Sequence, residues 1–321
     1  MSRCAGALLG LAAGDALGTT VEFSPPGSFI PLTDIVGGGP FHLKPGEWTD
    51  DTSMALCLAD SLIHCGAFNP WDQMDRYVRW WTTGYLGSNG RCFDIGNTTR
   101  DALERYRRTG DPMAGSANPR AAGNGCLMRL APVPLFFAAD PATAIRLSGL
   151  SARTTHGAAV CVDACRYLGA LLVGAAAGES REALLSELYT PVPGFWDEYP
   201  LHPEVEAVAR GSFKRKEPPA IKGSGYVAAS LEAALWAFHQ ARDFRAGCLA
   251  AVNLGDDADT TGAVYGQLAG AHFGLDGIPQ EWRPRLARPD LLHTLARLLA
   301  AQRPPQSGAA LQGGEPSKEL T

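Results

Sequence analysis

Two segments far apart in the chain carry glycine at every fourth position. On a helix, residues four apart lie on one face, so each segment would present a bare stripe. Glycine costs up to about 1 kcal/mol relative to alanine in a helix interior, and the Ala and apolar residues between the glycines argue against a flexible segment. The stripes therefore predict two helices whose backbones pack in close contact. They are Gly6, Gly10, Gly14 and Gly18 near the start, and Gly262, Gly266 and Gly270 near the end.

Apolar residues elsewhere recur with the period of a helix, for example over 54–62, 160–171, 228–238 and 264–271. Alternating strand patterns are almost absent, and no Pro-, Gly- and Ser-rich linker divides residues 1–302. We therefore expect an all-α fold, with a single compact multi-helix domain over residues 1–302. The segment 303–321 is rich in Pro, Gly, Ser and charge without an apolar face, so we expect a disordered tail there.

The overall charge bounds the class of ligand. The chain has 28 Lys and Arg against 33 Asp and Glu, a formal net charge of -5 and a pI near 5.8. This composition lacks the basic excess that attracts nucleic acid or an anionic membrane surface. We expect neither a nucleic-acid nor a membrane partner, and an anionic ligand would have to be held locally.

The cysteines and the apolar runs indicate a cytoplasmic protein. Eight cysteines form no C-x-x-C pair, and several lie inside apolar helical runs, which is typical of reduced, buried thiols. The start, MSRCAGALLGLAAGDALG, is like a signal peptide, but its apolar run is short and Asp15 interrupts it. No later apolar run is expected to approach the ~20 residues of a membrane span. Asp15 and the acids of 256–259 also exclude a membrane role for the glycine stripes.

The motif GEWTDDTSM places Asp50 beside Asp51 directly before an apolar helical pattern. Adjacent residues diverge by about 100° within a helix, but their side chains can converge at a helix start. There the free N–H groups favour anions, and Thr or Asp is a good N-cap. Taken alone, this motif is explained by helix capping.

A second acidic motif, GDDADTTGA, stands before another helical pattern two hundred residues later. Together the two motifs hold more acids than capping uses, and carboxylates brought together repel unless a cation lies among them. Carboxylate and hydroxyl oxygens without paired His or Cys suit Mg²⁺, Mn²⁺ or Ca²⁺ rather than Zn²⁺. The motifs predict a site for two such ions, which lie about 3.5–4 Å apart in two-metal hydrolytic sites. Judged by its spacing alone, Glu22 is expected to be a solvated side chain at a helix end and not a metal ligand.

Seven motifs then follow one another in a characteristic order between residues 4 and 274: GALLGLAAGDALGTTVEF, WTDDTSMALCLADSL, FDIGNTT, GNGCLMRLAPVPL, TTHG, GSGYVAASLEAALWAF and LGDDADTTGAVYGQLAGAHFG. In this order the chain resembles the ADP-ribosylglycohydrolase family, whose members include the dinitrogenase reductase-activating glycohydrolase. The resemblance implies an all-α fold with a binuclear Mg²⁺ or Mn²⁺ centre. It also implies a cleft that binds ADP-ribose and releases it from a modified side chain. The metal motifs do not depart from the family's pattern, so the sequence does not indicate an inactive, crystallin-like relative.

The resemblance assigns roles to the acids residue by residue. Asp51, Asp257 and Glu22 are the candidate proton acceptors in catalysis, and the choice among them stays open. Asp256 is interpreted as a helix-start residue and not as a ligand. The implied metal ligands are Thr49, Asp50, Asp51, Asp257, Asp259, Thr260 and Glu22.

The resemblance also implies a substrate-binding set. Gly123, Asn124 and Gly125 match the family's phosphate- and ribose-binding loop, in which small residues expose backbone N–H groups to an anion. A plain turn is the alternative for so short a motif. His156 matches a histidine that lines the ADP-ribose cleft, and a core or capping histidine is the alternative. Tyr226 matches an aromatic residue over the adenosine, and its alternative is the core face of the following helix.

Asp94, in RCFDIGNTT, resembles an acid that faces the modified guanidinium in arginine-specific members. Its alternative role is to cap the helix that runs through Thr98 to Tyr106. We expect a metal-dependent hydrolase that removes ADP-ribose from protein side chains, with a bond to arginine favoured and serine or another linkage as the alternative. The partners would be ADP-ribosylated protein and ADP-ribose, and the cofactors two Mg²⁺ or Mn²⁺ ions. A metal-dependent phosphoesterase and a non-catalytic ADP-ribose-binding relative are the rival classes.

Overall fold

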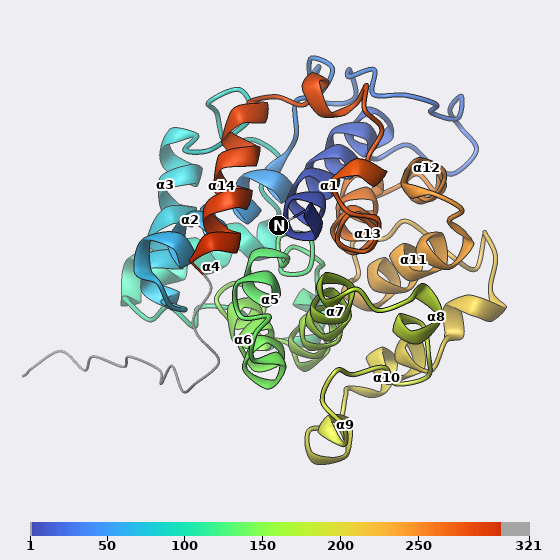
Figure 1. The fold of residues 1–321 in the computed structure, drawn as a ribbon. Helices are drawn as coiled ribbons and strands as arrows, with labels where there is room; N and C mark the ends of the chain where they lie inside the picture. Colours follow the sequence, from blue (N-terminus) through green and yellow to red (C-terminus); the bar gives the residue numbers. More distant parts are fainter. Residues whose placement is uncertain (1, 303–321) are drawn as a thin grey trace, which may run out of the picture.

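The chain folds into α-helices joined by loops (Figure 1). The structure, a computed structural model, describes residues 2–302, and within this range it has fourteen α-helices, short 3-10 turns and isolated β-bridges but no β-strand. The expected all-α fold is confirmed, and the predicted apolar periods lie in α2, α7, α11 and α13. The predicted disordered tail, 303–321, lies outside the described residues. The helices are α1 Ser2–Gly18, α2 Asp50–Cys65, α3 Pro70–Thr83, α4 Asn97–Thr109, α5 Pro132–Phe136, α6 Pro141–Arg153, α7 Ala159–Ala177, α8 Arg181–Leu184, α9 Phe195–Glu198, α10 Pro203–Ala209, α11 Val227–Gln240, α12 Phe244–Val252, α13 Ala258–Phe273 and α14 Pro289–Ala301.

The two glycine stripes form the central helix contact of the fold. α1 and α13 lie side by side and antiparallel, and they are the most extensively packed helix pair (Figure 1). A Cβ on Gly10 would overlap the carbonyl oxygen of Gly266, and a Cβ on Gly266 would overlap that of Gly10. The predicted backbone packing is confirmed, because any larger side chain would force the helices apart. The other matched pairs are Gly6 with Gly270 and Gly14 with Gly262.

This glycine seam brings the end of α1 against the start of α13. Gly18 lies against the backbone of Asp259, and a three-residue 3-10 turn then carries the chain to Glu22. α2 joins the same junction, so the starts of two helices and the end of a third meet at one place. A small buried cluster, with one residue from each helix, closes the junction: Leu11, Ala55 and Ala263.

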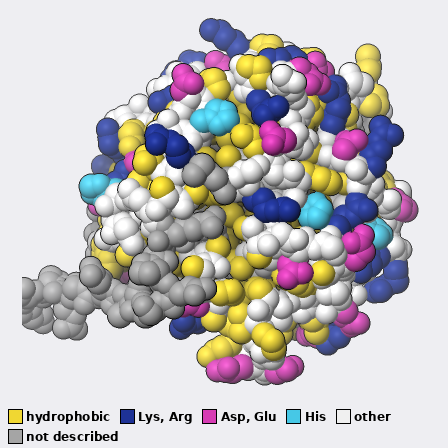
Figure 2. Space-filling model, viewed as in Figure 1, with side chains coloured by type: hydrophobic (Ala, Val, Ile, Leu, Met, Phe, Trp, Pro, Cys, Tyr) yellow, Lys and Arg dark blue, Asp and Glu magenta, His cyan; other side chains and the backbone are white. Residues whose placement is uncertain are grey.

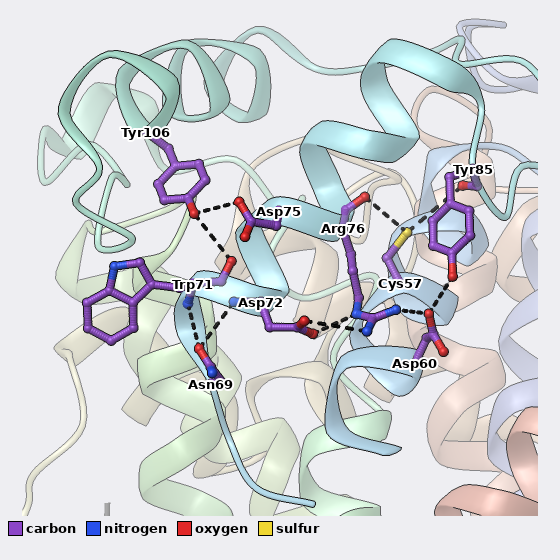
Figure 3. Close-up of polar contacts among 9 residues, drawn as sticks. All are labelled: Cys57, Asp60, Asn69, Trp71, Asp72, Asp75, Arg76, Tyr85 and Tyr106. Carbon is purple, nitrogen blue, oxygen red and sulfur yellow. Dashed lines mark hydrogen bonds and ion pairs between the residues drawn. The ribbon is translucent and has the colours of Figure 1, made fainter. Parts of the chain in front are cut away.

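Polar contacts link α2 to α3 and α3 to α4 (Figure 3). Arg76 of α3 forms ion pairs with Asp60 of α2 and, at 2.6 Å, with Asp72 one turn earlier on its own helix. The hydroxyl of Tyr106 on α4 donates a 2.7 Å hydrogen bond to Asp75 of α3. These contacts connect α4, and with it the loop that precedes α4, to α2 through α3.

Within residues 2–302, two helical segments have the length and hydropathy of a membrane span. They are the segment Ser2–Val21, which includes α1, and α7, with mean hydropathies of 1.4 and 1.5. The expectation that no later apolar run approaches this length was wrong for α7, which has 19 residues. Because 89% and 72% of the two windows are buried inside the protein, both segments have the burial of core helices.

Candidate active site

The first acidic motif lies at the start of α2 but does not cap it. Thr49 occupies the N-cap position and makes no side-chain cap bond. Instead, Asp15 of α1 accepts hydrogen bonds from the backbone N–H groups of Thr49 and Thr52, at 2.9 and 3.0 Å. Because Asp15 performs the capping, Asp50 and Asp51 are left for other partners. The capping interpretation of this motif is therefore wrong.

The second acidic motif behaves in the same way. Asp257 occupies the N-cap position of α13 and makes no side-chain cap bond. Its Oδ2 accepts a 2.7 Å hydrogen bond from Nδ2 of Asn124. The hydroxyl oxygen of Thr49 lies 3.2 Å from a carboxylate oxygen of Asp51 and 3.2 Å from one of Asp259. Two motifs separated by two hundred residues thus form one cluster.

The helix starts border a cavity of about 990 Å³. Of the predicted metal ligands, Thr49 and Asp51 are buried behind its wall and the other five line it. Among the described residues, the cavity lining includes no Lys or Arg, and its acids are Glu22, Asp50, Asp94, Asp256, Asp257 and Asp259. On the face of the protein drawn in Figure 2, by contrast, basic and acidic side chains are interspersed.

The cluster has the oxygen donors that a hard divalent cation requires. Oxygen atoms of Glu22, Asp94 and Asp259 lie within 4.8 Å of one another. Three buried oxygens, Glu22 Oε2, Asp51 Oδ1 and Asp259 Oδ1, have no hydrogen-bond partner among the described residues. Orphaned buried carboxylate oxygens carry a large desolvation cost, which a bound cation would offset. The residues therefore fit the implied Mg²⁺ or Mn²⁺ ions.

Burial and mutual repulsion raise the pKa values of these acids. Burial, followed by the charges of Asp94, Asp257 and Asp51, raises the pKa of Glu22 to about 10. Burial and nearby acids raise the pKa of Asp94 to about 7. The pKa of Asp259 is also raised well above its usual range, first by burial and then by neighbouring carboxylates. Without cations, the cluster would therefore hold protons near neutral pH.

Three residues of the lining adopt the left-handed backbone conformation, which is uncommon outside glycine. They are Phe23, Asp94 and Asp256, with φ of 60°, 61° and 51°. The N–H of Phe23 donates to the carbonyl of Asp256 at 2.7 Å, and the N–H of Asp256 donates to that of Ser24 at 2.8 Å. Asp94 does not cap α4, whose N-cap is Gly96 without a side-chain bond. The capping alternative for Asp94 is therefore wrong.

The predicted glycine loop, 123–125, and His156 line the same cavity. A Cβ on Gly125 would lie 2.9 Å from Cε1 of His156, so the loop and the imidazole are in close contact. Tyr226 forms an isolated bridge with Gly123, and its hydroxyl donates a 2.9 Å hydrogen bond to a glutamate of α10. The cavity lining includes the preceding residue, Gly225, rather than Tyr226.

A family model described as ADP-ribosylglycohydrolase matches residues 1–308, nearly the whole chain. The chain belongs to the ADP-ribosylglycohydrolase family. The family resemblance expected from the motifs is thus confirmed, and with it the class of enzyme.

Curated relatives and a solved structure agree with this family. The chain is 42% identical over 299 residues to an ADP-ribosylarginine hydrolase Tri1 of Serratia proteamaculans (strain 568), covering 93% of this chain and 79% of the relative. It is 34% identical to the ADP-ribosyl-dinitrogen reductase glycohydrolase of Rhodospirillum rubrum, covering 88% of this chain and 90% of the relative. A solved chain from an ADP-ribosylglycohydrolase-related protein complex matches with a TM-score of 0.82 and 47% identity, covering 94% of this chain and 98% of that one.

Sequence reasoning missed two buried charged residues of this ADP-ribosylglycohydrolase fold. The first is Asp15, which organises the start of α2. The second is Arg129, 1% exposed, whose guanidinium donates to the carbonyl of Gly125 at 3.0 Å and to the hydroxyl of Thr155 at 2.7 Å. Arg129 also lies over the ring of Tyr77, 4.6 Å from its centroid. Each stands as a lone charge within an apolar run of the sequence, and that pattern is the signal that identifies them.

Proposed function

We propose that this protein hydrolyses the N-glycosidic bond between ADP-ribose and an arginine side chain, with the help of two divalent ions. The observation that carries the proposal is the buried cluster of carboxylates with orphaned oxygens and no Lys or Arg in the described lining. Two relatives at 42% identity bear the name ADP-ribosylarginine hydrolase, which supports arginine as the linkage.

The ions would be held by the two acidic motifs and Glu22. Bound Mg²⁺ or Mn²⁺ supplies Lewis-acid anchoring of ribose hydroxyls and a water of lowered pKa. We assign ligation to Thr49, Asp50, Asp51, Asp257, Asp259, Thr260 and Glu22, because carboxylate and hydroxyl oxygens are the donors that these hard ions prefer.

The chain's own residues orient the substrate and move the proton. The bond between C1 of the ribose and the guanidino nitrogen breaks through an oxocarbenium-like transition state. A water adds to C1, the bonding electron pair leaves with the guanidino nitrogen, and that nitrogen ends with the proton that the water gives up. A carboxylate accepts the proton of the water, and the candidates are Asp51, Asp257 and Glu22. Asn124 donates to Asp257 and so fixes the orientation of that carboxylate beside the glycine loop.

The diphosphate would lie on the loop 123–125. Arg129 beneath this loop makes no ion pair with any described residue, although it is buried. An uncompensated buried cation favours an anion nearby. A diphosphate on the loop, with His156 beside it, places the ribose toward the acidic cluster. Tyr226, whose backbone pairs with Gly123, would lie on the adenosine side.

Asp94 would hold the arginine that leaves. Its carboxylate lines the cavity beside Glu22 and Asp259. A guanidinium offers a planar set of donors and a permanent charge once free, and a carboxylate binds it through charge-assisted hydrogen bonds. A seryl leaving group offers no such cation, so Asp94 favours the arginine linkage.

We also propose a cytoplasmic location, where thiols stay reduced. Cys57, Cys126, Cys161, Cys165 and Cys248 are buried thiols without a disulfide in the structure.

The decisive experiment is hydrolysis of a matched panel in which ADP-ribose is joined to arginine, to serine or to a nucleobase, each with and without EDTA. We expect release of ADP-ribose from arginine, and loss of that release in EDTA with recovery on adding Mg²⁺ or Mn²⁺. Preferential cleavage of the serine conjugate would overturn the linkage. Tight binding of ADP-ribose without turnover at any metal concentration would overturn the enzyme assignment, and cleavage of a phosphodiester control would indicate a phosphoesterase.

A further inference from the structure

A second cavity lies beside the acidic one and shares a wall with it. It has a volume of about 230 Å³, and we call it the rim pocket. Phe41 lines both cavities. Phe93, which lines the rim pocket, directly precedes Asp94 in the chain. The lining of the rim pocket is Phe41, Leu43, Asn89, Arg91, Cys92 and Phe93.

Aromatic side chains continue from the acidic cavity into the rim pocket. The ring of Phe41 lies 6.4 Å from that of Phe23 and 5.3 Å from that of Phe93, measured between centroids. Phe23 is 64% exposed and has a left-handed backbone conformation. Single exposed apolar residues are ordinary, but three adjoining aromatic rings at a cavity mouth are the kind of surface that binds another chain.

The rim pocket carries the opposite charge to the cavity beside it. Arg91 is exposed and forms no ion pair with any residue in the described range 2–302. The neighbouring lining holds six acids and no Lys or Arg among the described residues. An acidic group near the opening would therefore be attracted by Arg91.

The loop that presents Arg91 is held in place by tight backbone packing. A Cβ on Gly84 would lie 2.6 Å from Cα of Arg91 and would overlap the carbonyl oxygen of Gly90. The side chain of Asn89 accepts the N–H of Arg91 at 3.2 Å. The rim pocket is thus formed before any partner arrives, which lowers the entropic cost of binding.

We propose that the rim pocket binds the target polypeptide next to the modified arginine, with an apolar side chain against Phe93 and an acidic side chain at Arg91. This inference rests on the proposed function. In the proposed function the leaving arginine faces Asp94, and the rim pocket, lined by Phe93 and Arg91, adjoins that part of the cavity through Phe41. The occupant is therefore the flanking segment of the target protein, and the pocket selects targets by an apolar and an acidic residue near the modification.

The test compares a large and a small substrate that share the scissile bond. The large one is an ADP-ribosylated peptide with Leu and Glu placed within three residues of the modified arginine, and the small one is free ADP-ribosyl-arginine. For Arg91→Glu, kcat/KM on the peptide should fall about tenfold or more through KM, whereas kcat/KM on ADP-ribosyl-arginine should stay within twofold. Arg108→Glu, an exposed arginine of α4, is the matched control and should change neither substrate.

Charge exchange and apolar truncation sharpen this test. A peptide with Lys in place of Glu should be the better substrate for Arg91→Glu and the worse one for the wild type. Phe93→Ala should remove the preference for Leu over Ser in the peptide. Equal losses on both substrates, or no loss on the peptide, would overturn the proposal.

A separate readout keeps the inference distinct from the proposed function. Absence of turnover of both substrates by the wild-type protein would overturn the proposed function. Peptide binding would then still be measured with the Asp257→Asn variant. Weaker binding after adding Arg91→Glu to that variant would support the rim pocket, and unchanged binding would overturn it.

Discussion

Asp60 and Asp72 face Arg76 (Figure 3), whereas the acids of the cavity face one another. In the first group, partial burial acts to raise the pKa of Asp72, but hydrogen bonds from Arg76 and Ser61 outweigh it, and the pKa lies below its ordinary value. Asp60 also accepts a 2.5 Å hydrogen bond from the hydroxyl of Tyr85. This group, which we call the Arg76 cluster, is complete within the protein.

The acidic cavity lacks such internal partners. Burial and neighbouring carboxylates raise the pKa values of its acids, and some of its oxygens have no hydrogen-bond partner among the described residues. The comparison teaches that acids of one chain can serve two purposes. Acids paired with arginine attach helices to each other, whereas acids left with acids mark a place for a cation from outside.

The largest expected effect follows from removing one cavity acid. Asp257→Asn or Asp50→Asn should lower kcat/KM by about a thousandfold or more, equivalent to about 4 kcal/mol, because a metal ligand is lost. The helical content by circular dichroism should stay unchanged, since neither carboxylate makes a core contact. Asp60→Asn is the control from the Arg76 cluster and should keep its activity. Near-normal turnover of either cavity variant at saturating Mg²⁺ would contradict the metal assignment.

The glycine seam, which brings the cavity acids together, should tolerate no bulk. Gly266→Leu should lower the free energy of unfolding by about 1–3 kcal/mol or more, the typical cost of overpacking. The reason is that the carbonyl of Gly10 occupies the space that a side chain at position 266 would need. Denaturant unfolding measures this loss. Gly96→Ala is a suitable control, since a Cβ there meets nothing within 4 Å. Equal stability of both variants would show that the seam opens easily.

Divalent metal should stabilise the protein. At a hundredfold excess over Kd, Mg²⁺ or Mn²⁺ should add about 2.7 kcal/mol to the free energy of unfolding, seen as a higher Tm that EDTA reverses. A metal-independent Tm would contradict the site.

Without metal, the free energy of unfolding should fall as pH rises from about 4 to 7. The reason is that the raised pKa of Asp94, about 7, lets the folded state hold a proton that the unfolded state has released. Asp94→Asn should flatten this slope.

Breaking the Arg76 cluster should lower the stability of the protein but not its activity. Arg76→Met leaves Asp60 and Asp72 without their cation, and we expect a loss of about 2 kcal/mol, since the pair is only partly buried. Activity per folded molecule should stay unchanged and Mg²⁺ should not rescue the loss. Rescue by Mg²⁺ would show that these acids resemble those of the cavity after all.

The smallest expected effect concerns Asp94. Asp94→Ala should cut hydrolysis of ADP-ribosyl-arginine about tenfold, equivalent to about 1.4 kcal/mol, because the carboxylate holds the leaving group. The Kd of free ADP-ribose should barely change. Equal losses in both assays would instead place Asp94 among the metal ligands beside Glu22 and Asp259. No change in either assay would leave it without a functional role.

Much of the fold could be predicted from local patterns. The glycine stripes predicted the contact between α1 and α13, because a side chain of any size at Gly10 or Gly266 is excluded by the other helix. The apolar periods predicted α2, α7, α11 and α13. Each of these features repeats within a few residues, so it is visible without knowing what lies across from it.

Two interpretations of the acids could not be decided from the sequence. Capping and metal ligation use the same residues before a helix, and the choice depended on whether another side chain caps α2. Asp15 does so from a different helix, thirty-four positions earlier in the chain than Thr49. The same applies to Arg129, whose partners Thr155 and Tyr77 reach it only through folding.

By itself, then, the sequence determined the helical class, the close helix pair and the family, because periodicity, glycine spacing and motif order are properties of neighbouring residues. The tertiary structure alone decided that two acidic motifs share one cavity, that its described lining has no cation, and that an aromatic pocket with Arg91 opens beside Asp94. The physical reason is that electrostatic energy depends on distances through space. A carboxylate's neighbours, and therefore its pKa and its purpose, are set only when helices far apart in the chain meet.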